Sequence, residues 1–220
     1  MIMRNDILSP FENLPYFTIA GFRQVAGKTV SGGHYARVTL SRRVRSGQIL
    51  RLKKGVYMHR RFYERHRQSP PFSMIVSAIL LPQSYLSLEY VLQQHNLLTE
   101  ITYPVTAITP KNTRTLTNDL GTFVYRHIQS KLYRGFQLQE AYRVSYALAS
   151  SAKALFDYFY LHPFPAGQLA ATVNLAEELR LNLDDFTLQE RDEFAGYVAL
   201  SGKPKMQRIL TNLENFVWQP

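Results

Sequence analysis

A cluster of arginines with a serine lies between His34 and Ser46, in a segment whose spacing predicts a helix. Ala36, Leu40 and Val44 recur every four residues and predict its buried stripe. The positions expected to face away from that stripe are Arg37, Val38, Ser41, Arg42 and Arg45. A guanidinium can grip guanine O6 and N7 or a phosphate, and a serine hydroxyl can contact either kind of group. These residue types favour a helix that enters the major groove of DNA.

A predicted hairpin follows this helix directly. The β-prone runs Ile49–Leu52 and Val56–Met58 flank Lys53-Lys54-Gly55, and Gly55 supplies the positive φ that a tight turn requires. Cations on such a hairpin can lie along the phosphate backbone, as in the wing of a winged helix. The residues expected to follow the phosphates are Arg51, Lys53 and Lys54. An ordinary hairpin with solubilising lysines is the alternative, and the preceding arginine-rich helix favours the wing.

The positive charge of the chain is concentrated in its first third. Residues 1–70 hold 14 Lys and Arg against 3 Asp and Glu, a net charge of +11, whereas residues 71–220 hold 12 against 13, a net charge of −1. No acidic residue occurs between Glu12 and Glu64. A separate basic module beside a near-neutral body is typical of a protein that binds a polyanion. The alternative is a basic surface that only confers solubility.

Composition narrows the class of protein. Hydrophobic residues make up 45% of the 220 residues, which argues against a disordered chain. The absence of cysteine excludes disulfides and thiolate metal sites. The longest apolar run, Met74–Leu81, is too short to cross a membrane, and the first residues lack the apolar core of a signal peptide. We therefore expect a soluble, cytoplasmic protein without contact to a membrane.

The predicted fold is α+β, an N-terminal winged helix-turn-helix followed by a mixed α/β domain with a helical C-terminal tail. Pro70 and Pro71 disfavour a continuous helix where the charge balance changes, which predicts domains over 1–68 and 71–220. In the first domain, Thr18 is expected to cap a helix over 19–26, after a weak helix near 6–13.

The second domain is expected to combine short strands with helices. Ser87 is the expected N-cap of a helix over 88–95, Thr187 and Glu190 form an expected capping box, and Pro204 suits the first turn of the last helix. The other expected helices cover 72–81, 152–161, 168–180, 188–201 and 204–216. Strands are expected over 103–109, 121–128 and 143–147.

The order of several segments resembles the AbiEi-type antitoxins, the regulator half of the AbiE abortive-infection toxin–antitoxin systems. The resemblance covers about residues 14–165. Its segments are 14–18, 40–47, 50–57, 84–92, 95–98, 105–109, 113–115, 121–128 and 149–160. The chain departs from the family at His95-Asn96, where the family usually has His-Gly, and at Ser150–Lys153, where it usually has Glu-Pro-Glu-Lys.

The resemblance implies two activities and no catalysis. One activity is repression of the protein's own operon through the winged helix. The other is neutralisation of a nucleotidyltransferase-like toxin, which needs the C-terminal domain. The operator-binding features map onto Ser41, Arg42, Arg43, Arg45, Lys53 and Lys54. Double-stranded operator DNA and such a toxin are thus the expected partners, and a homodimer remains open.

The motifs of the common enzyme classes are absent from the sequence. Its six histidines lack the spacing of a metal site, and it contains no Walker loop, G-x-G-x-x-G or G-x-S-x-G motif. The sharpest catalytic alternative is a metal-dependent nuclease that uses Asp119 before a predicted strand with Gln129 and Lys131 after it. Two acidic ligands usually hold magnesium, and only one is present there. We therefore expect neither an enzyme nor a cofactor.

Arg114 and Arg126, with Tyr125 and His127, form an expected polar patch on the second domain. This patch is a weak candidate for binding a partner protein or RNA. The alternative is that the two arginines pair with acidic residues of the helical tail. The acidic residues considered are Asp184, Asp185 and Asp192. A second general alternative is an antitoxin that acts only by binding its toxin, in which case the basic first domain would be incidental.

Overall fold

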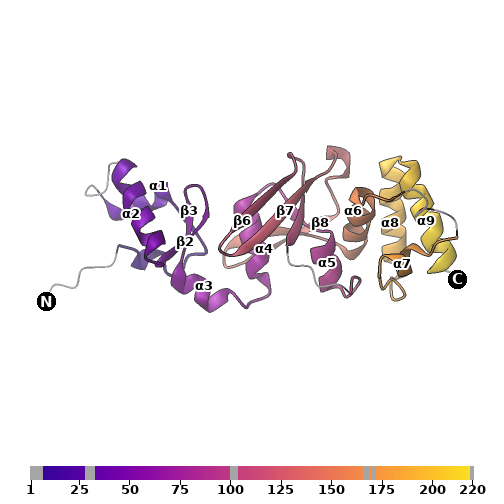
Figure 1. Cartoon of the computed structure of the whole chain (residues 1–220), viewed down its shortest axis with the longest axis horizontal. Coiled ribbons are helices and arrows are strands. Elements are labelled where there is room, and N and C mark those ends of the chain that lie inside the picture. The colour runs from indigo at the N-terminus through magenta and orange to yellow at the C-terminus, as the bar shows by residue number, and fades with distance from the viewer. Residues whose placement is uncertain (1–6, 28–32, 100–103, 166–168, 170–171, 219–220) are drawn as a thin grey trace. The chain divides into compact units, whose positions relative to one another are not determined.

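The computed structural model describes residues 7–27, 33–99, 104–165, 169 and 172–218, which form a mixed α+β structure with two sheets (Figure 1). The chain divides into two compact units. The first unit comprises Met1–Pro82, Leu116–Thr122 and Glu140–Tyr146, and the second comprises Gln83–Thr115, Phe123–Gln139 and Ala147–Pro220. The first unit thus continues past the boundary predicted at 68–71.

The N-terminal part of the first unit alternates short helices with three short strands. The 3-10 helix η1 (Ser9–Phe11) precedes strand β1 (Phe17–Thr18), helix α1 (Ile19–Ala26) and helix α2 (Gly33–Arg45). Strands β2 (Ile49–Lys53) and β3 (Val56–His59) form the expected hairpin, and helices α3 (Arg60–His66) and α4 (Pro71–Leu80) follow. The three strands form one antiparallel sheet in the order β1–β3–β2.

Local sequence signals set the ends of these elements. The Thr18 hydroxyl oxygen accepts a hydrogen bond from the amide of Gly21 at 3.1 Å, which caps α1 as predicted. Gly47, with a φ of 71°, ends α2, and Gly55, with a φ of 79°, forms the β2–β3 turn. Glycine adopts these left-handed conformations readily because it has no Cβ to clash with the backbone. The helix, the hairpin and their order therefore agree with the sequence pattern.

One apolar cluster holds the N-terminal elements together. Its buried members are Leu8, Phe11, Phe17, Phe22, Ala36, Leu40, Ile49 and Tyr57. Val44 and Ile19 pack against this cluster from its margin. The cluster draws on η1, β1, α1, α2 and the hairpin, so α2 is fixed by the packing of its apolar stripe rather than by local helix propensity alone.

The second sheet has six strands in the order β6–β7–β5–β4–β9–β8. Its strands are β4 (Tyr85–Leu86), β5 (Val105–Thr109), β6 (Arg114–Asn118), β7 (Gly121–His127), β8 (Phe136–Ala141) and β9 (Val144–Ala149). Strand β4 runs antiparallel to β5 and parallel to β9, and β5 runs parallel to β7. Strands β5, β7 and β9 match predicted segments, whereas β4, β6 and β8 were missed.

The helices of the second unit include most of those predicted. They are α5 (Glu89–Gln94), α6 (Ser151–Leu161), α7 (Leu175–Glu178), α8 (Leu188–Ser201) and α9 (Pro204–Phe216), with the 3-10 helix η3 (Ser130–Leu132) after β7. Helix α6 packs against α5 and α8. The capping box of Thr187 and Glu190 and the position of Pro204 in the first turn of α9 are confirmed.

Two expected helix starts were wrong. Ser87 does not cap α5, because its hydroxyl donates to the Asp157 carboxylate, and Leu88, with a φ of 62°, occupies the N-cap position without a side-chain cap. The helix predicted from residue 168 appears as α7, which begins at Leu175 after an Asn174 cap. Residues 166–168 and 170–171 of that region lie outside the described residues. None of the described helices has the length and apolar character needed to span a bilayer.

Candidate nucleic-acid interface

Helix α2 separates apolar and basic side chains as its spacing predicted. Ala36 and Leu40 are 0% exposed, and Val44 packs against the same apolar cluster. The side chains of Arg37, Ser41, Arg42 and Arg45 are exposed, whereas Val38 and Arg43 are half-buried. The exposed set, here called the α2 basic face, presents three guanidinium groups and one hydroxyl on a single rigid element.

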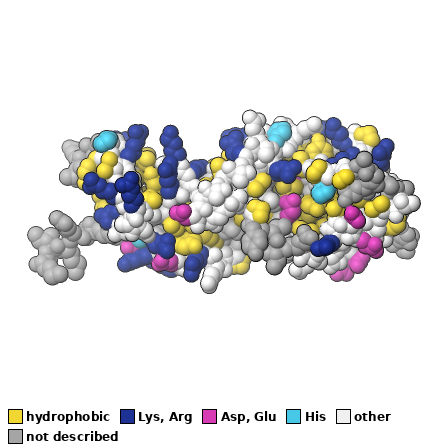
Figure 2. Space-filling view, in the orientation of Figure 1, with side chains coloured by type: hydrophobic (Ala, Val, Ile, Leu, Met, Phe, Trp, Pro, Cys, Tyr) yellow, Lys and Arg dark blue, Asp and Glu magenta, His cyan; other side chains and the backbone are white. Residues whose placement is uncertain are grey.

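Within the described part of the chain, no acidic side chain forms an ion pair with the α2 basic face. The ion pairs there are Arg60–Glu64, Arg61–Glu12 and Lys153–Asp157. Arg43 is engaged differently, because its Nη1 donates to Oε1 of Gln48 at 2.5 Å just beyond the helix end. Figure 2 shows Lys and Arg side chains gathered over the first unit. The α2 basic face can therefore attract an anion without first losing an internal salt bridge.

The hairpin offers fewer free cations than expected. Arg51 and Lys54 are exposed, the latter in the turn itself. Lys53 instead donates from Nζ to the backbone carbonyl oxygens of Ile79 at 2.7 Å and Leu80 at 3.0 Å, at the end of α4. Burial lowers the pKa of this ammonium. Lys53 was expected to lie along a phosphate backbone. This geometry does not fit that expectation, because the ammonium already donates hydrogen bonds to the carbonyl oxygens at the end of α4.

Helix α3 adds basic residues that the sequence analysis did not single out. Arg60 donates to Glu64 at 2.9 Å, Arg61 donates to Glu12 at 2.8 Å, and Arg65 donates to Asn13 at 2.7 Å. The pairing of Arg60 with Glu64 could have been predicted from the sequence, because the two residues are four positions apart. These contacts distinguish the α3 arginines from those of the α2 basic face.

The expected patch of the second unit is less open than predicted. Arg114 donates from Nε to the carbonyl oxygen of Asn112 at 3.3 Å, and the half-buried Arg126 donates to that of Leu161 at 3.2 Å, at the end of α6. Tyr125 is 0% exposed. Neither arginine joins an ion pair with the tail acids in the described residues. Arg126 thus binds the Leu161 carbonyl at the end of α6, which leaves Arg114 and His127 as the exposed members of the patch.

The residues of the nuclease alternative lie on either side of β7. Asp119 is in the turn before this strand, and Lys131 is in η3 after it. A seven-residue strand is roughly 23 Å long, so the strand itself separates the two groups. Lys131 donates from Nζ to the carbonyl oxygen of Ser201 at 3.2 Å. Among the described residues, no cluster of three or more His, Asp and Glu side chains is placed to hold a metal ion.

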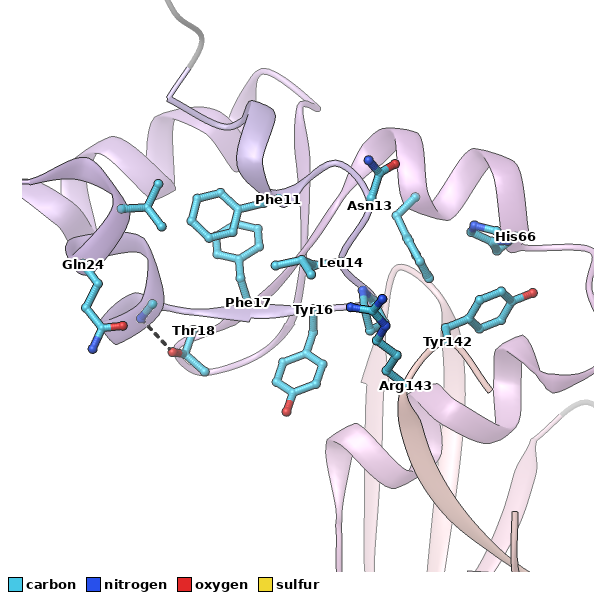
Figure 3. A pocket seen from close by; sticks show the side chains of 14 residues that line it. Phe11, Asn13, Leu14, Tyr16, Phe17, Thr18, Gln24, His66, Tyr142 and Arg143 are labelled. Atoms are coloured by element: carbon cyan, nitrogen blue, oxygen red, sulfur yellow. Dashed lines mark hydrogen bonds between the residues drawn. The ribbon is translucent and has the colours of Figure 1, made fainter. Parts of the chain in front are cut away.

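A cavity of about 760 Å³ opens on the first unit beside α1 (Figure 3). Its walls come from the η1–β1 segment, α1, α3 and the β8–β9 turn. Leu14 and Tyr16 are each 40% exposed at this site, and Val25 is 50% exposed. Phe11 and Phe17 line it as well and belong to the cluster that buries α2. Residues far apart in the chain form this cavity, so no local sequence pattern indicated it.

No protein-family model matches this chain, and the search of curated proteins found no match for it. The resemblance to the AbiEi antitoxins therefore stays a prediction from the sequence segments. In the absence of a family match, the side chains of the α2 basic face and of the second unit are the evidence for function.

Proposed function

We propose that the protein is an antitoxin-type transcriptional regulator that acts in the cytoplasm and binds operator DNA through a winged helix in its first unit. The observation that carries this proposal is the α2 basic face, in which Arg37, Ser41, Arg42 and Arg45 are exposed and the arginines belong to none of the ion pairs of the described residues. In this reading α2 is the recognition helix and enters the major groove.

The order of elements around α2 supports the assignment. A helical turn, a short strand, two helices and a β-hairpin follow one another in the chain, and the three strands pair in one sheet. This order is compatible with the proposed winged helix. The shared apolar cluster holds α1 and α2 together, and three residues separate the end of α2 from the start of the hairpin. This arrangement supports the proposal that the hairpin serves as the wing.

The roles of the cations follow from their surroundings. Arg42 and Arg45 lie on the exposed side of α2, where they can reach base edges or flanking phosphates, and Ser41 lies between them and Arg37. Arg51 and Lys54 are free to contact the phosphate backbone from the hairpin. Phosphate contacts of this kind release counterions, so affinity should fall steeply as salt rises.

The test is fluorescence anisotropy with labelled DNA from the protein's own promoter and a scrambled duplex of the same composition. Arg42→Ala should weaken promoter binding by about 1–3 kcal/mol and reduce the preference over the scrambled duplex if Arg42 reads a base. An equal loss on both duplexes would assign Arg42 to a phosphate. Arg60→Ala is the matched control, because it removes the same charge from a paired arginine of the same unit.

Failure to prefer the promoter at moderate salt would contradict the regulator assignment. It would favour an antitoxin that works only by binding a protein partner. It would not by itself favour a nuclease, and a magnesium-dependent cleavage assay on plasmid with Asp119→Asn tests that alternative separately.

A second activity, binding of a partner protein, is proposed for the second unit because of strand β8. This strand ends the sheet order, so one side of its backbone lacks a neighbouring strand among the described residues. Leu138 is 76% exposed, and Phe136–Gln139 carries no charge that would deter pairing. An added strand from a partner would satisfy this edge. The resemblance to AbiEi antitoxins suggests a nucleotidyltransferase-like toxin as that partner.

This second activity is tested by co-purification with the product of an adjacent nucleotidyltransferase-like gene. Leu138→Lys should abolish co-purification, because a lysine on an edge strand opposes pairing. Leu188→Lys is the control, since Leu188 is 75% exposed and belongs to helix α8 rather than to a strand. Loss of partner binding in both variants, or in neither, would contradict the edge-strand assignment.

A further inference from the structure

The lining of the cavity beside α1 is mostly apolar, with several polar side chains among its residues. Its aromatic wall residues are Phe11, Tyr16, Phe17, Phe62, His66 and Tyr142. The side chains of Leu14, Pro15 and Val25 extend the apolar surface. A volume of about 760 Å³ lies within the range of small-molecule sites in proteins. Aromatic walls favour an aromatic guest, because ring contacts add to the free energy gained by removing apolar surface from water.

One cation accompanies this apolar lining. Among the described residues that line the cavity, Arg143 is the only one with a permanently charged side chain, and no Asp or Glu lines it. Arg143 is exposed, and it takes part in none of the ion pairs of the described residues. Its side chain extends from the β8–β9 turn toward Tyr16 (Figure 3). A guanidinium in this position can bind a carboxylate in bidentate fashion.

The turn that presents Arg143 is held in place by contacts within the first unit. Tyr142 and Arg143 have φ values of 52° and 61°, a left-handed pair that forms a tight turn. The Tyr142 hydroxyl hydrogen-bonds the Ser69 hydroxyl at 2.7 Å, and its ring packs edge-on against Phe62 with centroids 5.5 Å apart. His66 also contacts the Tyr142 ring, at 4.4 Å between centroids. The guanidinium is thus mounted on an anchored turn at the cavity wall.

We propose that this cavity binds a small aromatic carboxylate, with the ring against the apolar walls and the carboxylate on Arg143. The size of the cavity, its aromatic lining and its single cation each limit the class of ligand. A polycation has no anionic partner at the cavity wall, and a highly polar ligand would leave much of the apolar lining unused.

The cavity shares side chains with the packing that positions α2. Phe11 and Phe17 line the cavity and lie in the cluster that buries Ala36 and Leu40. A ligand that displaces these rings would alter the support of the α2 basic face. An effect of the ligand on DNA binding therefore rests on the proposed function, whereas binding of the ligand to the cavity does not.

The experiment is isothermal titration calorimetry of the full chain, without DNA, with 3-phenylpropanoate and its neutral analogue 3-phenylpropanamide. We expect saturable binding of the carboxylate with a Kd on the order of 0.1–1 mM, as fits a ligand of this size. The amide should bind about tenfold more weakly, since it cannot form the charge-assisted pair. Equal affinity for the two compounds, or no saturable binding of the carboxylate, would overturn the proposal.

Variants separate the site from nonspecific uptake. Arg143→Gln should remove the preference for the carboxylate, and Val25→Glu should repel the carboxylate while retaining the amide. Arg114→Gln, which removes an exposed arginine outside the cavity, should retain the preference. If Arg143→Gln and Val25→Glu both bind the carboxylate as the unaltered protein does, the cavity is not the site.

A parallel anisotropy titration with promoter DNA, with and without 3-phenylpropanoate, measures the coupling to α2. Calorimetric binding without promoter binding would contradict the regulator proposal and leave the ligand site supported. Promoter binding without calorimetric binding would contradict the ligand site and leave the regulator proposal supported.

Discussion

Lys153 and Asp157 lie one turn apart on α6 and form an ion pair with both side chains 0% exposed. The Lys153 ammonium lies 2.5 Å from Oδ1 of Asp157, while Oδ2 accepts hydrogen bonds from Tyr85 at 2.9 Å and Ser87 at 2.8 Å. The rings of Phe156 and Tyr197 also lie near the ammonium, at 4.8 and 5.1 Å. Burial lowers the pKa of Lys153, and the Asp157 carboxylate counteracts that shift.

Removing one charge of this pair should be costly. Asp157→Asn would leave the Lys153 ammonium buried without a counter-charge, which is expected to lower the free energy of unfolding by about 3–5 kcal/mol. Urea denaturation followed by fluorescence of Trp218, the single tryptophan, measures the change in the second unit. Trp218 is a suitable probe because it is 6% exposed and stacks on Phe186.

An exposed pair with the same spacing provides the control for that prediction. Arg60 and Glu64 are also four residues apart, but their side chains are 46% and 55% exposed. Glu64→Gln should change the unfolding free energy by less than about 1 kcal/mol, since water and salt screen the pair. Circular dichroism measures both variants on the same scale. Comparable losses in the two variants would show that burial does not govern the Lys153–Asp157 contribution.

The glycine at position 135 should not tolerate a side chain. A Cβ there would lie 2.1 Å from the Tyr197 hydroxyl oxygen and 3.0 Å from Cγ of Lys153, and the residue has a φ of 79°. Gly135→Ala is therefore expected to cost about 2–4 kcal/mol in urea denaturation, from backbone strain and overpacking together. Gly202→Ala, at a φ of 61° with open space around its Cβ, should cost about 1 kcal/mol from strain alone.

The capping box of α8 should make stability depend on pH. Burial disfavours ionisation of Glu190, but hydrogen bonds from Ser151 and Thr187 outweigh burial and lower the pKa below its ordinary value of 4.5. A carboxylate whose pKa is lowered by folding stabilises the folded state above its unfolded-state pKa, and this contribution is lost as pH falls through the folded-state pKa.

Glu190→Gln should therefore destabilise the protein by about 1 kcal/mol at neutral pH. The difference from the unaltered protein should shrink as the pH falls below 4.5. Thermal unfolding across a pH series measures both quantities. A difference that stays constant down to the acid limit would mean that the carboxylate charge contributes nothing to the cap.

The two lysines of the hairpin should behave differently in DNA binding. Lys54→Ala should lower the slope of log affinity against log salt by about 1, because it removes the phosphate contact proposed for this exposed ammonium. Lys53→Met should leave that slope unchanged and lower the free energy of unfolding by about 1 kcal/mol, since the α4 carbonyls lose their donor. Salt titrations followed by anisotropy distinguish the two variants. A reduced slope for Lys53→Met would show that Lys53 contacts a phosphate after all.

Sequence periodicity predicted the helix that carries the proposed interface. The repeat of Ala36, Leu40 and Val44 requires no knowledge of distant residues, because the stripe is encoded within a single element. The glycines at positions 47 and 55 likewise mark the helix end and the hairpin turn through their own backbone requirements. The α2 basic face was therefore accessible from the sequence.

Contacts between distant segments were not accessible in this way. Ser87 precedes a helix and looked like its cap, yet its hydroxyl binds Asp157, 70 residues further along the chain. Lys53 looked like a free lysine and instead binds α4 carbonyls. The short strand β4 has only two residues, too few for a period of two to be recognised. In each case the tertiary partner, not the local pattern, decides the role.

The bond from Lys53 to the end of α4 has a consequence for the energetics of DNA recognition. It fastens strand β2 to a helix that is buried along most of its length, including Ile75 and Val76 at 0% exposed. A hairpin restrained in this way has already lost much of its conformational freedom before DNA arrives. Little entropy would remain to be lost in the proposed complex with DNA, so the phosphate contacts proposed for Arg51 and Lys54 would contribute more fully to affinity.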